Sequence, residues 1–143
     1  MTQTSLELLN EWYDRIWVRQ DLEAINLLFT PDTEAMGMMD FAVGPEDFRV
    51  LAEAILAQID VTGVQFERAI EMGDWAWATF TAQAVALRDR SPIAVSGQIM
   101  ARVTDGRIVE AYNQVDFLSL FEQLGYLPKD SLALCLSGEG LGL

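Results

Sequence analysis

Residues 103–128 read VTDGRIVEAYNQVDFLSLFEQLGYLP and decide the fold, because strand and helix signals follow one another directly within them. Asp105-Gly106 favours a two-residue hairpin turn, since both residue types tolerate the positive φ that such a turn requires. The run RIVEAYNQV then predicts a strand. Asp116 suits the N-cap of a short helix, and Gly125 suits the residue just beyond its end. We therefore expect a hairpin whose second strand leads straight into a helix at Asp116.

Upstream of this stretch, three more segments predict strands. Gly73-Asp74 marks another tight turn between two of them. The three segments cover residues 64–70, 75–87 and 93–103, and the first of them alternates from Val64 through Phe66 and Arg68 to Ile70. With residues 107–115 they predict an antiparallel meander of about four long strands.

The first half of the chain reads as helical. Apolar residues recur every three or four positions over Ser5–Arg19 and again over residues 45–59, where Pro45 fits the first helical position. Asp21 is a candidate cap for a helix over residues 22–29. Residues 33–44 predict a short irregular strand and a loop. Helices followed by an antiparallel meander and a short final helix define an α+β fold.

Composition narrows the function classes. The chain has 143 residues and a formal net charge of −13, which disfavours binding to nucleic acid and to anionic membranes. No signal-peptide pattern and no apolar run of ~18 residues is found. The single cysteine, Cys135, fits a cytoplasmic location. The absence of histidine excludes Ser-His-Asp and Cys-His catalysis in their usual forms.

Several motifs together resemble a known family. These are WYDRIWVRQDLEAINLLFTPD at residues 12–32, Gly44-Pro45, EMGDWAWATF at residues 71–80, and the stretch 103–128 quoted above. In order and spacing they resemble the nuclear-transport-factor-2-like superfamily, and within it the SnoaL-like polyketide cyclase group, over roughly residues 8–128.

The resemblance implies one domain over residues 1–143, with a core at about 5–128 and a tail at 129–143. It implies a cone in which a strongly bent antiparallel sheet wraps around three N-terminal helices and encloses a deep pocket. Members of the superfamily include ketosteroid isomerases, polyketide cyclases, epoxide hydrolases and non-catalytic binding domains. Homodimers through the sheet face that the helices leave free are common among them, and we expect one here.

Asp116 is the candidate catalytic residue. In the cyclases an aspartate at this position is the base, assisted by histidines, and this chain keeps the aspartate without them. Alternation places Tyr112, Gln114 and Asp116 on one face of the last strand. If that face lines the cavity, burial raises the pKa of the carboxyl group, so that it can abstract a proton or donate to an enolate. The alternative is an ordinary helix cap.

The remaining candidate ligand contacts are of two kinds. Methionine and aromatic side chains suit an adaptable apolar wall, although core packing explains each of them equally well. Arg68 and Gln98 lie within strands and could orient a substrate oxygen, or Arg68 could pair with a surface carboxylate. The full set of candidate ligand-binding residues is Tyr13, Trp17, Met36, Met38, Arg68, Gln98, Met100, Tyr112 and Gln114.

Two functions remain open at this level. One is an isomerase or cyclase, similar to a ketosteroid isomerase or polyketide cyclase, that acts on an apolar carbonyl compound by proton transfer at Asp116 and needs neither an organic cofactor nor a metal. The other is a non-catalytic domain of the same fold that binds a hydrophobic ligand or forms dimers. The apolar tail, SLALCLSGEGLGL, could pack on the sheet or on a partner subunit.

Overall fold

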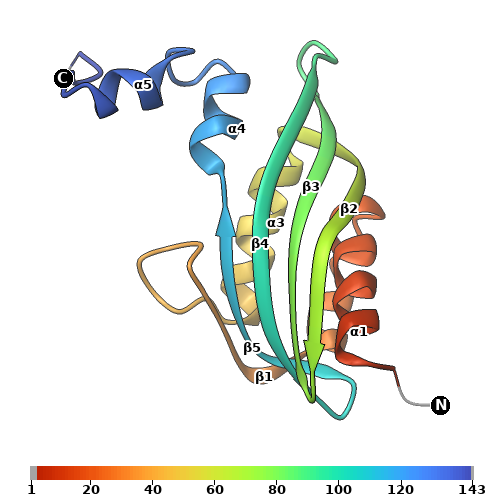
Figure 1. Cartoon of the computed structure of the whole chain (residues 1–143). Helices are drawn as coiled ribbons and strands as arrows, with labels where there is room; N and C mark the ends of the chain where they lie inside the picture. The colour runs from red at the N-terminus through yellow and green to blue at the C-terminus, as the bar shows by residue number, and fades with distance from the viewer. Residues whose placement is uncertain (1–2, 143) are drawn as a thin grey trace.

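Five strands form one curved sheet in the order β1-β5-β4-β3-β2 (Figure 1). The computed structural model describes residues 3–142. The strands β2 (Ile59–Met72), β3 (Trp75–Ala86), β4 (Pro92–Thr104) and β5 (Arg107–Val115) are the antiparallel meander that the sequence predicts. The predicted turn between β4 and β5 is confirmed, because Asp105 and Gly106 have φ of 51° and 74°.

The fifth strand, β1 (Phe29–Met36), is longer than the short irregular strand that we expected and pairs with β5 in parallel. Pro31 lies inside it, which the sheet tolerates because β1 is an edge strand. The buried Thr33 hydroxyl donates to the carbonyl oxygen of Ile108 at 2.6 Å and helps to hold the strand in place. The sheet is therefore mixed, not purely antiparallel.

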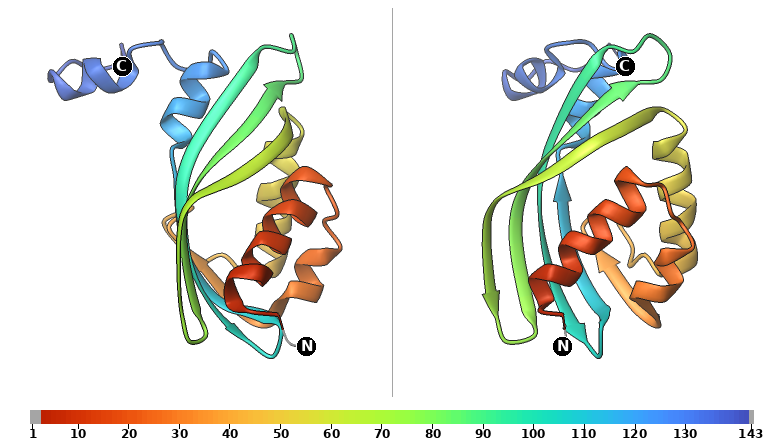
Figure 2. Two further views of the ribbon diagram at one scale, coloured as in Figure 1. Left: turned by 45° about the vertical axis from the view of Figure 1, so that its right-hand side comes forward. Right: turned by 90° about the vertical axis from the view of Figure 1, so that its right-hand side faces the viewer.

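The N-terminal helices cover one side of the sheet (Figure 2). They are α1 (Ser5–Tyr13), α2 (Ala24–Leu28) and α3 (Pro45–Leu56), and α1 continues directly into one turn of π-helix, η1 (Asp14–Val18). Asp21 does not cap α2 as predicted, because its carboxylate pairs with Arg15. We call the side of the sheet that packs on these helices the inner face and the other side the outer face.

On β3 the two faces separate cleanly. Ala76, Ala78 and Phe80 are buried on the inner face, whereas Trp75 and Trp77 are half-buried on the outer face. On β2 the alternation is interrupted, because Phe66 pairs with Phe80 but Arg68 pairs with Thr79. This bulge adds one residue and reverses the phase of everything that follows it.

Two helices follow the sheet. Asp116 caps α4 (Phe117–Gln123), as predicted, and Gly125 follows the helix with φ of 81°. Leu120 of this helix and Leu124, which directly follows it, are buried in one cluster with residues of β2, β3 and β4. The last helix, α5 (Ser131–Leu136), projects away from α1–α3 on the side toward which the outer face looks (Figure 2). The tail thus does not pack on its own sheet, and Leu136 is 79% exposed.

Candidate ligand-binding cavity

A cavity of about 80 Å³ lies on the inner face, between the two hydrophobic clusters of the core. Small side chains create this space. Five of the six inner positions of β3 are alanines, and two of these, Ala82 and Ala84, line the cavity. Only Phe80 is bulky. Because an alanine fills little of the gap between sheet and helices, the sheet can bend over the helices and still leave room for a guest.

Aromatic rings from four elements form one wall of the cavity. Trp12 and Tyr13 come from α1, Trp17 from η1, Phe48 from α3 and Phe80 from β3. The Tyr13 ring lies 5.0 Å from the Phe80 ring, and the Phe48 ring lies 5.2 Å from that of Trp12 and 6.1 Å from that of Trp17, between centroids. Such packing fixes the positions of the rings and gives the cavity a rigid wall.

Two neutral polar side chains face this apolar surface, Tyr13 and Asn113. Within residues 3–142 the Tyr13 hydroxyl makes no hydrogen bond, yet every fully enclosed side-chain oxygen or nitrogen there has a partner. The hydroxyl therefore borders the open space of the cavity. Burial raises the pKa of Tyr13, so the phenol stays protonated at neutral pH and can donate a hydrogen bond.

Asn113 is the only buried polar side chain of β5. Its Nδ2 donates a long hydrogen bond of 3.4 Å to the carbonyl oxygen of Met36, and the residue lines the cavity. No aspartate, glutamate, lysine, arginine or cysteine of residues 3–142 lines the cavity. The polar groups of the lining are thus the Tyr13 hydroxyl, the Asn113 amide and the indole N–H groups of Trp12 and Trp17, and none of them takes up or releases a proton near neutral pH.

The structure brings three of the predicted ligand contacts together in this cavity: Tyr13, Trp17 and Met38. The others lie on the outer face: Met36, Arg68, Gln98, Met100, Tyr112 and Gln114.

The expectation that the polar face of β5 lines the cavity is wrong, because Asn113 and Val115 point inward and Tyr112 and Gln114 point outward. Arg68 was assigned inward from the phase of Phe66, and the bulge between them turns it outward.

Asp116 lies outside the cavity. Its two neighbours in the chain, Val115 and Phe117, line the cavity, whereas Asp116 itself is exposed on the other side. Its Oδ1 accepts a hydrogen bond from the backbone N–H of Ser119 at 3.0 Å. The helix-cap interpretation of Asp116 is confirmed. Asp116 does not line the apolar cavity, but with Gln98 and Gln114 it lines a wide, half-polar hollow on the outer face.

The outer face has a different chemistry. The Trp77 indole donates to Gln98 at 3.0 Å, and Glu110 accepts hydrogen bonds from Arg102 and Tyr112, both at 2.7 Å. These two hydrogen bonds, with that from Arg102 the stronger cause, lower the pKa of Glu110. Around this polar centre lie exposed apolar side chains: Met36, Ile70, Met72 and Met100. This surface is an open, mixed face and not an enclosed site.

Trp12, Phe48 and Asn113 are cavity residues that the sequence did not single out as ligand contacts. Trp12 and Phe48 looked like ordinary core residues, since their apolar spacing is that of any amphipathic helix. For Asn113 a signal existed. It is the one amide between two apolar neighbours of the same phase, Ala111 and Val115, on a strand whose inner face is otherwise apolar.

Comparison with known proteins identifies the family. A sequence profile described as the SnoaL-like domain matches residues 9–111, so the chain belongs to the SnoaL-like family of the nuclear-transport-factor-2-like superfamily. No curated protein matches the sequence.

Several solved structures share the fold. TsrD from Streptomyces laurentii superposes with a TM-score of 0.70 at 18% identity, covering 89% of this chain and 99% of that one. IdmH from Streptomyces antibioticus superposes with a TM-score of 0.69 at 20% identity, covering 86% and 99%. A SnoaL-like polyketide cyclase from Agrobacterium tumefaciens gives 0.68 at 14%, covering 87% and 100%. At these identities the likeness shows the fold alone.

Two further observations concern the described residues. No helix in residues 3–142 combines the length and the apolar character that a membrane crossing requires. The same residues contain no group of three or more side chains of metal-binding type arranged around a common point.

Proposed function

We propose that this chain binds a small, neutral, mostly apolar molecule in the inner cavity. The observation that carries the proposal is the composition of the lining, which is aromatic and aliphatic apart from one tyrosine hydroxyl and one amide. Ligand sites typically combine an apolar wall with a few placed polar groups. The Tyr13 hydroxyl would donate to a carbonyl or ether oxygen of the ligand, and Asn113 would orient it.

Of the two functions that the sequence left open, the geometry favours binding over proton transfer. A proton-transfer enzyme needs an acid or base within hydrogen-bond reach of the reacting carbon. The carboxylate of Asp116 points away from the cavity and is already bonded to Ser119. An isomerase or cyclase mechanism that uses Asp116 is therefore not part of this proposal.

The volume limits the guest. A cavity of about 80 Å³ is smaller than the ~300–1,000 Å³ of typical drug-sized pockets and closer to apolar cavities of about 150 Å³ that take up benzene. The largest guest that we expect in such a volume is a single small ring or a short chain. A four-ring ketone exceeds this volume and would not fit unless lining side chains moved.

The four tryptophans supply the test. Trp12 and Trp17 line the cavity, whereas Trp75 and Trp77 lie on the outer face. We would titrate ¹⁵N-labelled protein with cyclohexanone, a single ring with one acceptor oxygen, and follow the four indole N–H signals. Saturable shifts of the Trp12 and Trp17 signals are expected, with those of Trp75 and Trp77 unchanged. Shifts confined to the outer pair would overturn the assignment of the cavity as the site.

We also propose that the outer face forms a homodimer. Met72 is 75% exposed and Met100 is 40% exposed, and α5 extends its uncharged residues over the same side of the molecule (Figure 2). Apolar patches of this kind mark association surfaces.

Sedimentation velocity across concentrations tests the dimer. The variant Met100→Glu should shift the protein toward monomer, and Val50→Glu on the exposed side of α3 is the matched control. A wild-type protein that stays monomeric at about 100 μM, well above the micromolar Kd of a weak specific complex, would contradict the proposal. A cytoplasmic location remains a prediction from the sequence.

A further inference from the structure

The first helix contains a local irregularity next to the cavity. From Asp14 to Val18 it is wound as a π-helix, and the backbone N–H of Arg19 donates to the carbonyl oxygen of Asp14, five residues earlier, at 2.9 Å. Regular α-helical hydrogen bonds span four residues. The π turn lies at the C-terminal end of this helix, where turns of this type also occur in other proteins.

The extra residue changes which side chains face the cavity. In a regular α-helix Trp17 would be rotated by about 140° from Trp12, because each residue turns the helix by about 100°. A π turn is wound more loosely, so it brings the residue five positions on closer to the first. In the structure both indoles approach the same ring, Phe48, and both line the cavity. A regular α-helix would still place Trp17 within about 40° of Tyr13, which also lines the cavity, so the effect of the π turn is to bring Trp17 closer to Trp12.

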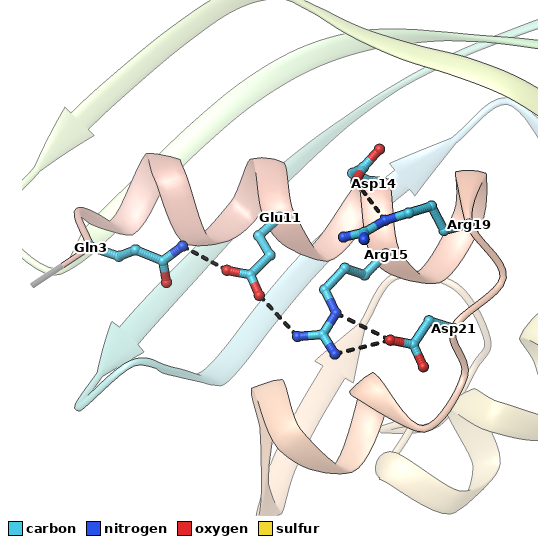
Figure 3. Close-up of polar contacts among 6 residues, drawn as sticks. All are labelled: Gln3, Glu11, Asp14, Arg15, Arg19 and Asp21. Atoms are coloured by element: carbon cyan, nitrogen blue, oxygen red, sulfur yellow. Dashed lines mark hydrogen bonds and ion pairs between the residues drawn. The ribbon is translucent and has the colours of Figure 1, made fainter.

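One arginine spans this turn. Arg15 Nη1 donates to Glu11 at 3.0 Å, and Arg15 Nε and Nη2 both donate to Asp21, at 3.2 and 2.9 Å (Figure 3). Glu11 belongs to α1 before the π turn, and Asp21 belongs to the loop after it. The backbone N–H of Asp21 also donates to the carbonyl oxygen of Arg15 at 2.8 Å. Gln3 donates to the other carboxylate oxygen of Glu11.

This arrangement resists unwinding. A guanidinium presents several donors in a fixed plane, so the carboxylates before and after the turn are held at a set separation. The side chain of Arg15 is only 24% exposed, whereas Arg19, which pairs with Asp14 across the same turn, is 59% exposed. The ion pairs of Arg15 are therefore better shielded from solvent than the pair between Arg19 and Asp14, and solvent weakens them less.

We propose that Arg15 is a positioning residue of the ligand cavity: its bonds to Glu11 and Asp21 hold the π turn that keeps Trp17 beside Trp12. Arg15 does not itself line the cavity. The proposal rests on the proposed binding function for its affinity readout. Its structural readout, the position of the Trp17 indole, is independent of any ligand.

The test compares Arg15→Met with Arg49→Met. Arg49 likewise bonds two carboxylates, Glu23 and Glu53, but lies on α3. Methionine keeps much of the aliphatic stem in both variants. In ligand-free protein, Arg15→Met should shift the Trp17 indole N–H signal, and the signals of Trp75 and Trp77 should stay in place. Cyclohexanone should bind about fivefold more weakly, a loss typical of a partly exposed ion-pair network. Arg49→Met should leave both readouts unchanged.

The outcomes separate the two proposals. If wild-type protein does not bind cyclohexanone, the binding function fails, and the Trp17 signal still decides the role of Arg15. If the Trp17 indole N–H signal of Arg15→Met stays at its wild-type position, the positioning role is overturned. An equal shift of this signal in Arg49→Met would overturn it too. Should Arg15→Met fail to fold, Glu11→Gln and Asp21→Asn each remove one side of the clamp, and each should shift the Trp17 signal partway. A wild-type signal in both would overturn the proposal.

Discussion

The two faces of the sheet are built from alternate residues of the same strands, yet they offer opposite environments. On β3, Phe80 and Ala82 point into an apolar cavity whose only polar groups are neutral, whereas Trp77 and Thr79 point toward an open surface with charged pairs. The polar residues that suggested a reactive pocket lie on the open face. Alternation thus groups residues by face, but it does not say which face the helices cover.

The largest expected effect is on the free energy of unfolding, and it is tested by replacing one tryptophan from each face of the sheet. Trp12 is 3% exposed and stacks on Phe29 with ring centroids 4.3 Å apart, whereas Trp77 is only half-buried. Trp12→Ala should therefore cost about 3–5 kcal/mol of unfolding free energy, typical of large-to-small core changes, and Trp77→Ala about 1 kcal/mol. Urea unfolding at a concentration where the protein is monomeric measures both. Equal losses would mean that the two faces are not energetically distinct.

A second prediction concerns a substitution on the inner face that fills the cavity. Ala84→Leu adds three heavy atoms where the chain now leaves space, so cyclohexanone affinity should fall by at least about tenfold, while overpacking costs no more than about 1–3 kcal/mol of stability. Gln83→Leu, at the exposed neighbouring position, is the control and should bind the probe as wild type does. Undiminished binding in Ala84→Leu would exclude this cavity as the binding site.

A third prediction concerns the Tyr13 hydroxyl as a donor to the ligand. Tyr13→Phe removes the cavity hydroxyl, so the preference for cyclohexanone over methylenecyclohexane, which lacks the oxygen, should fall about fivefold, as for loss of one neutral hydrogen bond. Tyr112→Phe removes a hydroxyl that is bonded to Glu110 on the outer face and should leave that preference unchanged. The ratio of the two dissociation constants from NMR titration gives the result. An unchanged ratio in Tyr13→Phe would show that the phenol does not contact the probe.

The smallest expected effect concerns Asp116. Asp116→Ala removes the hydrogen bond to the Ser119 N–H and should cost about 1 kcal/mol of stability, the usual contribution of an N-cap, whereas Asp116→Asn should cost less because asparagine also caps helices. Neither variant should change cyclohexanone binding. A loss of probe affinity in Asp116→Asn, at unchanged stability, would mean that the carboxylate reaches the cavity after all.

Features that depend on neighbouring residues could be predicted from the sequence. The turn at Asp105-Gly106, the cap at Asp116 and the end of α4 at Gly125 all formed as expected, because each depends on the φ and hydrogen-bonding preferences of one or two residues. The four long strands and three N-terminal helices followed from hydrophobic periodicity. Of the cavity, Tyr13, Trp17 and Met38 were predicted, since each lies in a segment whose apolar character was plain.

What the tertiary structure alone decided depends on contacts between distant residues. The parallel pairing of β1 with β5 joins segments about eighty positions apart, and the bulge that turns Arg68 outward is visible only in the pairing of β2 with β3. The choice of face for Asn113 and Asp116, and the π turn that brings Trp17 beside Trp12, likewise follow from how sheet and helices pack. Sequence periodicity shows which side chains of one element share a face. Only packing against another element decides whether that face is buried or exposed.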